Sequence, residues 1–417
     1  MNHKAEILAV GTEILLGDIV NSDAAEVSRA LSSLGIDVCW HSVVGDNPAR
    51  LREAVEIART RADILITTGG LGPTYDDLTK ETLAACFGLP LVFHPEEAEK
   101  IKAYFASIGK EMTENTLRQA WLPEGCTPFF NHNGTAPGCG FTAMGIRVAM
   151  LPGPPRELKK MIETGLIPWL EQFGEGVLLS HDIRIFGMGE SAVETLLHDR
   201  MEALTNPTLA PYAGTGEVRL RVSAKASAEE EAEALAAPVI REVREVLGDL
   251  VYAVDEPSLE AVCLRLLTEK GLTFAAAESC TGGLIAKRIT DLPGASAVFL
   301  GGVVSYTNTV KARLLGVPSR ILEEYGAVSR ETALAMAAGV RERTGADLAV
   351  SVTGICGPAS DERNTPVGTG FVGFAAPDRL VCRPIQMGSD RERGRVFAAS
   401  HAFDLLRRWL TGTLRDS

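Results

Sequence analysis

Short apolar runs alternate with helical segments from Ala5 onward, and this alternation restricts the first part of the chain to few folds. The run at 62–70 is apolar on both faces, as expected of a buried strand. Apolar strands separated by helices are typical of a parallel sheet covered by helices. We therefore expect an α/β domain over residues 1–173. Its expected strands are 5–11, 36–46, 62–70 and 145–155, and its expected helices are 21–35 and 47–62.

Two further units follow. Residues 174–255 combine a strand, a glycine turn and a helix with a period-two strand and an acidic amphipathic helix, which predicts a small α+β linker domain. A proline-marked boundary then opens residues 256–417, where strands and helices alternate again and predict a second α/β domain. The strands expected there are 273–279, 299–306, 346–354 and 368–376, and a long helix is expected at 390–410.

Charge and cysteine usage exclude several classes of protein. Lys plus Arg number 41 and Asp plus Glu number 54, giving a net charge of −13, so no direct nucleic-acid partner is expected. The eight cysteines are scattered, without a C-x-x-C pair, as in a reduced cytoplasmic protein. We expect neither a signal peptide nor a membrane-spanning segment.

A glycine-rich turn at 67–79 follows the buried strand and precedes a helix. Gly69, Gly70 and Gly72 allow close approach of a ligand, and the next helix offers free N–H groups suited to phosphate. The turn fits neither the Walker A nor the G-x-G-x-x-G pattern. Two more tight turns, at 133–138 and 151–158, end neighbouring segments.

Acidic residues lie near the same strand ends, and carboxylates there can hold a magnesium-like ion against a diphosphate. The alternative is a purely structural turn in which Asp76 or Asp77 caps the following helix. The acidic residues concerned are Glu13, Asp18, Asp46, Asp76 and Asp77.

A second group of reactive residues surrounds Ser279, which lies between a strand and a helix N-terminus. No Ser-His-Asp triad is evident, and we expect His401 to be a surface or packing residue. Lys311 is the alternative base, because burial can lower the pKa of a lysine enough for it to accept a proton. Tyr306 can relay that proton or orient the base.

The neighbouring Cys280 is an equally plausible nucleophile on chemistry alone. Adjacent residues on an extended segment point in opposite directions, so we expect only one of the pair to face a ligand. The loop at 353–358 adds the Thr353 hydroxyl and glycine N–H groups, and Cys356 within it is expected to pack.

Five ordered blocks, GTEILLGDIVNSD, VVGDN, TTGGLGPTYDDLT, NGTAPG and LPGPP, closely resemble the N-terminal domain of CinA proteins. The resemblance implies a three-layer MoaB/MogA-like molybdopterin-binding fold. It also implies hydrolysis of ADP-ribose with a divalent metal (Mg²⁺ or Co²⁺) and K⁺, with Asp46 and Asp77 as metal ligands. The nucleotide-site residues that it implies are Gly69, Gly70, Gly72, Pro73, Thr74, Asp77, Asn21, Gly134 and Thr135.

The blocks AAAESCTGG, SYTNTVK, GAVS and VTGICGP similarly resemble the C-terminal domain of CinA, over residues 258–410. The resemblance implies a nicotinamide mononucleotide (NMN) amidohydrolase that needs no cofactor and releases nicotinate mononucleotide and ammonia, in a homodimeric protein. It implies Ser279 as nucleophile with Tyr306, Lys311 and Thr353 assisting, and Arg393 nearby, although Arg393 also reads as a solvated helix charge. The implied substrate-binding residues are Thr281, Gly282, Gly283, Gly354 and Gly357.

One segment departs from the family pattern. Family members follow TGIAGP with a glycine-rich stretch and a Lys-Pro-Val-Gly turn, whereas residues 359–366 here contain neither glycine nor that lysine. We expect this loop to hold a ligand differently. Two other functions stay open: a nucleotide-binding regulatory protein without turnover, and a molybdopterin-binding enzyme.

Overall fold

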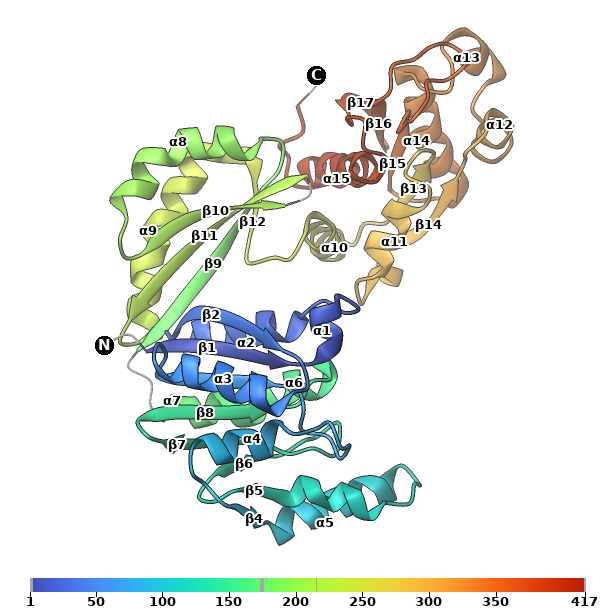
Figure 1. Ribbon diagram of the computed structural model, residues 1–417. Helices are drawn as coiled ribbons and strands as arrows, with labels where there is room; N and C mark the ends of the chain where they lie inside the picture. Colours follow the sequence, from blue (N-terminus) through green and yellow to red (C-terminus); the bar gives the residue numbers. More distant parts are fainter. Residues whose placement is uncertain (1–2, 173–175, 215, 416–417) are drawn as a thin grey trace. The chain divides into compact units, whose positions relative to one another are not determined.

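The computed structural model describes residues 3–172, 176–214 and 216–415, which form two compact units (Figure 1). The first unit contains Met1–Leu179 and Ala224–Leu235, and the second contains Ser180–Ser223 and Ala236–Ser417. The predicted domain boundary at 173–174 lies outside the described residues.

A six-stranded mixed sheet with the order β2-β1-β3-β8-β7-β6 forms the centre of the first unit. The first four strands run parallel, whereas β7 runs antiparallel to β8 and β6 antiparallel to β7. The predicted mixed α/β architecture is therefore confirmed. The strands are β1 (Lys4–Val10), β2 (Asp37–Val44), β3 (Ile64–Thr68), β6 (Thr127–Phe129), β7 (Gly138–Ala143) and β8 (Ile146–Leu151).

Helices cover both faces of this sheet, because successive strand residues point to opposite sides. Ile7 and Ile66 belong to one buried cluster with α2, and Leu8 and Leu65 belong to the other with α3. These helices and their neighbours are α1 (Thr12–Leu16), α2 (Ser22–Ser33), α3 (Pro48–Arg59), α4 (Thr79–Cys86), α6 (Pro155–Met161) and α7 (Ile167–Glu171), with a short π-helix at Ile162–Leu166.

A small excursion between α4 and β6 was not predicted. It contains the hairpin of β4 (Leu91–Phe93) and β5 (Trp121–Pro123), the helix α5 (Pro95–Ser107) and a 3₁₀ segment at Glu114–Ala120. The 3₁₀ segment carries Gln119, which lines a pocket of the first unit.

The middle region forms a four-stranded sheet with the order β10-β11-β9-β12, accompanied by two helices (Figure 1). Residues of β11 alternate between buried and half-buried, as their period-two pattern predicted. The elements are β9 (Val177–Ile185), α8 (Glu190–Ala203), β10 (Thr208–Gly214), β11 (Glu217–Ala226), α9 (Glu229–Leu247) and β12 (Val251–Val254).

A five-stranded sheet with the order β14-β13-β15-β16-β17 forms the C-terminal part. The strands β14, β13 and β15 run parallel, so their carboxyl ends meet at one edge. The strands are β13 (Phe274–Glu278), β14 (Phe299–Val304), β15 (Leu348–Gly354), β16 (Thr369–Ala376) and β17 (Arg379–Gln386). The helices are α10 (Leu259–Lys270), α11 (Leu284–Thr290), α12 (Asn308–Leu315), α13 (Ser319–Glu324), α14 (Arg330–Thr344) and α15 (Arg391–Leu410).

Each face of this sheet has its own core. Phe274 and Ala276 pack in one buried cluster with α10 and α15, and Ala275 and Ala277 pack in the other with α14. None of the helices within the described residues is long and apolar enough to cross a membrane.

Candidate functional site

Ser279 follows β13 directly, at the edge where the parallel strands end. Its side chain is 8% exposed, and its amide donates to the Val352 carbonyl at 3.0 Å, which fixes the turn against β15. Lys311 from α12 donates from Nζ to Ser279 Oγ at 2.9 Å and to the Ser305 carbonyl at 2.6 Å. The structure therefore brings together the two residues on which the predicted chemistry depends.

Lys311 is almost completely buried, with 1% of its surface exposed. Burial penalises the ammonium and lowers its pKa to about 8, although the neighbouring Cys280 partly opposes this shift. A pKa this close to neutrality gives the amine a substantial neutral fraction in mildly alkaline solution, as a general base requires.

Glu278 organises the turn, and the sequence analysis missed it. Its carboxylate is 1% exposed and accepts hydrogen bonds from the amides of Gly283 at 3.0 Å, Ile285 at 3.1 Å and Ala286 at 3.0 Å. A negative charge at these amides is favoured by the positive end of the α11 dipole. The signal was present in the sequence, as an acidic residue a few positions before a helix start.

This arrangement narrows the choice of groups that can stabilise an oxyanion. The Gly283 amide is occupied by Glu278, and the Gly282 amide donates to the Ser279 carbonyl at 3.1 Å. Of the three backbone N–H groups at 281–283, the one left to stabilise an oxyanion is therefore the N–H group of Thr281. The Thr281 hydroxyl is buried, and it has no hydrogen-bond partner within the described part of the chain.

The remaining predicted residues make contacts of their own near Ser279 and Lys311. Thr353 is buried and donates from Oγ1 to the Ala327 carbonyl at 2.7 Å. Tyr306 is 61% exposed, and its hydroxyl accepts from Arg391 Nη2 at 3.3 Å. Gly354 lies opposite Gly370 in the β15–β16 ladder.

Arg393 is placed differently from the expectation. Two other arginines of α15 contact the site: Arg391 Nη1 donates to the Gly357 carbonyl at 2.7 Å, and Arg395 Nη2 donates to the Thr281 carbonyl at 2.7 Å. Positions 391 and 395 share a helix face, and position 393 is turned about 200° away. Arg393 instead lines a separate hollow of about 440 Å³.

That hollow also contains His401, which the sequence left as a surface or packing residue. Its ring packs against Phe186 at 4.9 Å and Phe397 at 4.4 Å between centroids, and burial lowers its pKa to about 4. His401 is therefore a packing residue rather than a base.

The thiol next to Ser279 is held as a neutral group. Hydrogen bonding with the Cys356 thiol, together with burial, raises the pKa of Cys280 well above the ordinary thiol value. The same hydrogen bond lowers the pKa of Cys356 to about 7, and both thiols belong to the apolar core. These surroundings favour Ser279 over Cys280 as the nucleophile.

The divergent loop at 359–366 is tied down on α13. Arg363 donates to the carbonyls of Glu324 at 2.9 Å and of Glu323, and Asp361 accepts from the Thr365 amide at 2.8 Å. An arginine and an aspartate thus hold the loop, which the family pattern builds with glycines.

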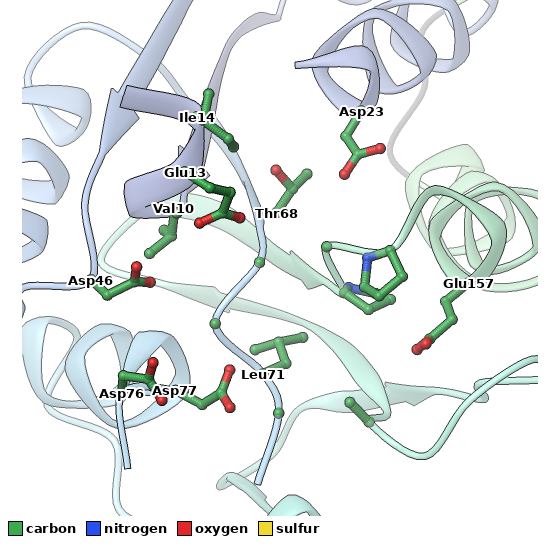
Figure 2. A pocket seen from close by; sticks show the side chains of 18 of the residues that line it. Val10, Glu13, Ile14, Asp23, Asp46, Thr68, Leu71, Asp76, Asp77 and Glu157 are labelled. Carbon is green, nitrogen blue, oxygen red and sulfur yellow. The ribbon is translucent and has the colours of Figure 1, made fainter. Parts of the chain in front are cut away.

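The glycine turn of the first unit lines a pocket of about 560 Å³ (Figure 2). Gly69 and Gly70 have φ of 92° and 68°, and a Cβ on Gly69 would lie 2.2 Å from the Val10 carbonyl oxygen. Only glycine fits these positions. Of the predicted nucleotide-site residues, the pocket lining includes Gly69, Gly70, Gly72, Pro73, Asp77 and Thr135.

The other three predicted residues have structural contacts. The Asn21 side chain accepts from the Ala24 amide at 3.1 Å and caps α2. Thr74 donates from its amide to Asp77 Oδ2 at 2.9 Å, and a Cβ on Gly134 would collide with Glu157. These contacts support residues of the pocket wall, and the wall itself does not include Asn21, Thr74 or Gly134.

The capping alternative for Asp76 and Asp77 is wrong. Helix α4 begins after Leu78 without a side-chain cap, and Asp77 instead accepts hydrogen bonds within its own turn. Asp46 is oriented similarly, because its Oδ2 accepts from the Thr12 amide at 2.9 Å and from the Thr12 hydroxyl at 2.8 Å. Both carboxylates line the pocket.

The acidic lining is the main electrostatic feature of this pocket. The carboxylates on its wall are Glu13, Asp23, Asp46, Asp76, Asp77 and Glu157, and no lysine or arginine of the described chain accompanies them there. No three of the described Asp, Glu, His and Cys residues lie close enough together to form a metal site on their own. A metal in this pocket would need further ligands from a bound molecule.

Comparison with known proteins covers nearly the whole chain. Residues 6–172 match the family model described as "Probable molybdopterin binding domain", residues 180–253 the "Damage-inducible protein CinA KH domain", and residues 256–410 the "CinA C-terminal domain". The region predicted as an α+β linker is thus matched by a KH-domain model.

Full-length relatives agree with these matches. A CinA-like protein of Dictyoglomus turgidum is 46% identical over 98% of this chain and 99% of its own length. One from Desulfovibrio desulfuricans is 48% identical over 98% and 96%. A solved competence/damage inducible protein of Agrobacterium tumefaciens is 38% identical over 37% of this chain and 97% of its own, with a TM-score of 0.35. The chain therefore belongs to the CinA family, with a MoaB/MogA-like N-terminal domain and a KH domain between its two ends.

Proposed function

We propose that the Ser279 site hydrolyses the carboxamide of NMN to nicotinate mononucleotide and ammonia. The observation that carries this proposal is the 2.9 Å hydrogen bond between two buried residues, Lys311 Nζ and Ser279 Oγ. A serine hydroxyl needs a neighbouring base to become a nucleophile, and a buried lysine with a lowered pKa is such a base.

The proposed reaction is an acyl transfer. Neutral Lys311 takes the proton of Ser279 as Oγ attacks the carboxamide carbon, and the oxyanion forms beside the Thr281 amide. Lys311 then gives the proton to the departing nitrogen, so that ammonia leaves and an ester remains on Ser279. Water, deprotonated by Lys311, hydrolyses the ester and restores the enzyme. The positive pyridinium ring makes this amide more electrophilic than an ordinary one.

The arginines at the site supply charge for the substrate phosphate. Arg391 reaches from α15 to the exposed Tyr306 hydroxyl and to the Gly357 carbonyl, two groups that the proposal places around the substrate. Guanidinium groups pair well with phosphate oxygens. We assign phosphate binding to Arg391 in place of Arg393.

We further propose that the N-terminal pocket hydrolyses ADP-ribose with a divalent metal. The observation that favours this activity is an acidic pocket beside a glycine turn. An anionic diphosphate needs cations to enter it, because every charged residue of its described lining is acidic. Asp46 and Asp77 would hold the ion, with diphosphate oxygens completing its shell, as magnesium sites commonly do. The ion, when bound, supplies polarisation of a phosphoryl oxygen.

One experiment tests both proposals. The purified full-length protein is incubated with NMN and with ADP-ribose separately, with and without a divalent metal, and ammonia and AMP are measured. Ser279→Ala and Asp77→Ala serve as reciprocal controls, because each is expected to remove one activity and spare the other. Absence of ammonia from NMN would leave a regulatory nucleotide-binding role, and pterin binding would support the molybdopterin alternative.

A further inference from the structure

Two residues that line the N-terminal pocket each have a buried oxygen atom to which no described residue donates a hydrogen bond. Asp23 Oδ1 and Gln119 Oε1 are both buried, and neither has a hydrogen-bond donor among the described residues. Gln119 is only 2% exposed, and its amide nitrogen makes one long contact, 3.5 Å, with the Leu71 carbonyl. Unsatisfied buried acceptors cost free energy, so each is a place where a bound molecule can donate a hydrogen bond.

Asp23 differs from the other carboxylates of the pocket. It stands in the first turn of α2, and in Figure 2 it lies on the other side of the glycine turn from Asp76 and Asp77. Asp46 is oriented by the Thr12 hydroxyl at the start of α1, and Asp77 by the Thr74 amide of its own turn. Glu157 likewise accepts from Asn131 Nδ2 at 2.6 Å. Asp23 is thus the acid whose buried oxygen is left for the ligand.

Asp23 remains mostly ionised at pH 7, although its surroundings oppose the charge. Burial and the nearby Glu26 raise its pKa to about 6, and Lys159 partly opposes this rise. Lys159 is itself paired with Glu26, with Nζ 2.8 Å from Oε1. An ionised carboxylate at pH 7 offers several lone pairs and no proton, so a hydroxyl is a suitable partner and a phosphate is not.

We propose that Asp23 accepts hydrogen bonds from ribose hydroxyls of the bound nucleotide and so makes the pocket selective for an intact ribose. This inference rests on the proposed binding of ADP-ribose to the pocket. A carboxylate hydrogen-bonds a ribose hydroxyl in the same way in dinucleotide-binding folds, where an Asp or Glu binds the 2′-hydroxyl of NAD. Gln119, on another wall, is a second acceptor for the same ligand.

The test is a calorimetric titration of the full-length protein with ADP-ribose and with two analogues, each lacking the 2′-hydroxyl of one ribose. Magnesium and potassium are present throughout, and AMP release is followed in parallel. The variants are Asp23→Ala, Asp23→Asn, which keeps an acceptor oxygen, and Ser22→Ala as a matched control. Ser22 is an exposed neighbour on the same helix turn and does not line the pocket. Thermal melting verifies that each variant is folded.

Asp23→Ala is expected to weaken ADP-ribose binding by about tenfold to a hundredfold, the loss for a hydrogen bond to a charged group. Asp23→Asn should recover part of this loss, and Ser22→Ala should bind like the wild type. One of the two deoxy analogues should bind the wild type weakly, and Asp23→Ala should not weaken the binding of that analogue further. The proposal would be overturned if Asp23→Ala weakened the binding of ADP-ribose and of both analogues equally. It would also be overturned if the variant changed only the requirement for magnesium or potassium, because Asp23 would then be a cation ligand.

These outcomes separate the inference from the proposed activity. Wild-type protein that binds ADP-ribose without releasing AMP refutes the hydrolysis, while the variants still decide the role of Asp23. Wild-type protein that hydrolyses ADP-ribose and is unaffected by Asp23→Ala refutes the inference alone. If ADP-ribose does not bind at all, both are wrong.

Discussion

Lys311 Nζ donates to Ser279 Oγ while the same nitrogen donates to the carbonyl oxygen of Ser305. The second contact fixes the amine in place, because Ser305 directly follows β14 and its amide donates to the Glu278 carbonyl at 2.7 Å. Lys311 is therefore held by the backbone of one strand end, and Ser279 by that of the next.

Replacing the nucleophile separates the two candidates at this turn. Ser279→Ala should reduce ammonia release from NMN by at least about a thousandfold, as removal of a catalytic nucleophile does. Cys280→Ala should retain activity within a few-fold, because its thiol is neutral and buried in the core. Steady-state kinetics with a folding check decides between them, and the reverse result would move the nucleophile to Cys280.

The pH dependence of deamidation should report Lys311. Its pKa is lowered to about 8, so the amine is charged and inactive as a base well below that pH. We expect kcat/KM for NMN to rise as pH increases through about 8 and then to level off. Lys311→Arg should be nearly inactive at every pH, because a guanidinium stays protonated. A flat profile between pH 6 and 9 would exclude Lys311 as the base.

The same shift affects stability, with a definite sign. Burial of the ammonium destabilises the folded state in full below the folded pKa, where both states are protonated. Between the folded and the unfolded pKa values the unfolded chain binds more protons, and the destabilisation is relieved as pH rises. Unfolding free energy should therefore increase as pH rises from about 8 toward 10.5. Lys311→Met should remove this increase, which denaturant titrations of both proteins at several pH values can measure.

Glu278 should matter for both folding and catalysis. Glu278→Gln removes a buried charge that accepts from three backbone amides, and one of the amide hydrogens of the new side chain would face those donors. We expect a loss of about 1–3 kcal/mol in unfolding free energy and a lower kcat for NMN. The exposed Glu269→Gln provides the comparison, with no loss expected in kcat. Unchanged kcat in a destabilised Glu278→Gln would limit Glu278 to a folding role.

The glycine turn of the first unit gives a matched pair of substitutions. Gly69 and Gly88 both have positive φ, but an added Cβ meets the Val10 carbonyl oxygen at Gly69 and open space at Gly88. Gly88→Ala should cost about 1 kcal/mol for the backbone alone. Gly69→Ala should cost more and abolish AMP release while deamidation continues. Similar melting temperatures for the two variants would contradict this reading of the turn.

Local patterns predicted much of the fold and the centre of each site. The sheets, the glycine turn, Ser279 and Lys311 follow from short-range signals: apolar periodicity, glycine spacing and residues at strand ends. The sequence analysis missed β17, the hairpin of β4 and β5, and the strands β6, β7, β10 and β12. Several of these strands have only three or four residues, and they are defined by their partners rather than by a strong pattern of their own. The sequence analysis expected Arg393 near Ser279, where the structure has Arg391 and Arg395, because a shift of two residues on α15 reverses the direction of the side chain.

Helix α15 presents two different faces to its surroundings. Arg395 donates to Thr281 in the turn that carries Ser279, and Arg391 donates to Gly357 in the loop at 353–358. The hollow next to residues 187–190 of the KH domain is lined instead by Arg393, Phe397 and His401. A helix of 20 residues moves as a stiff rod over distances of a few ångströms. Any rotation of α15 that widened the hollow would therefore also move Arg391 and Arg395 away from the carbonyls of Gly357 and Thr281. A change in the hollow would thus change the surroundings of Ser279.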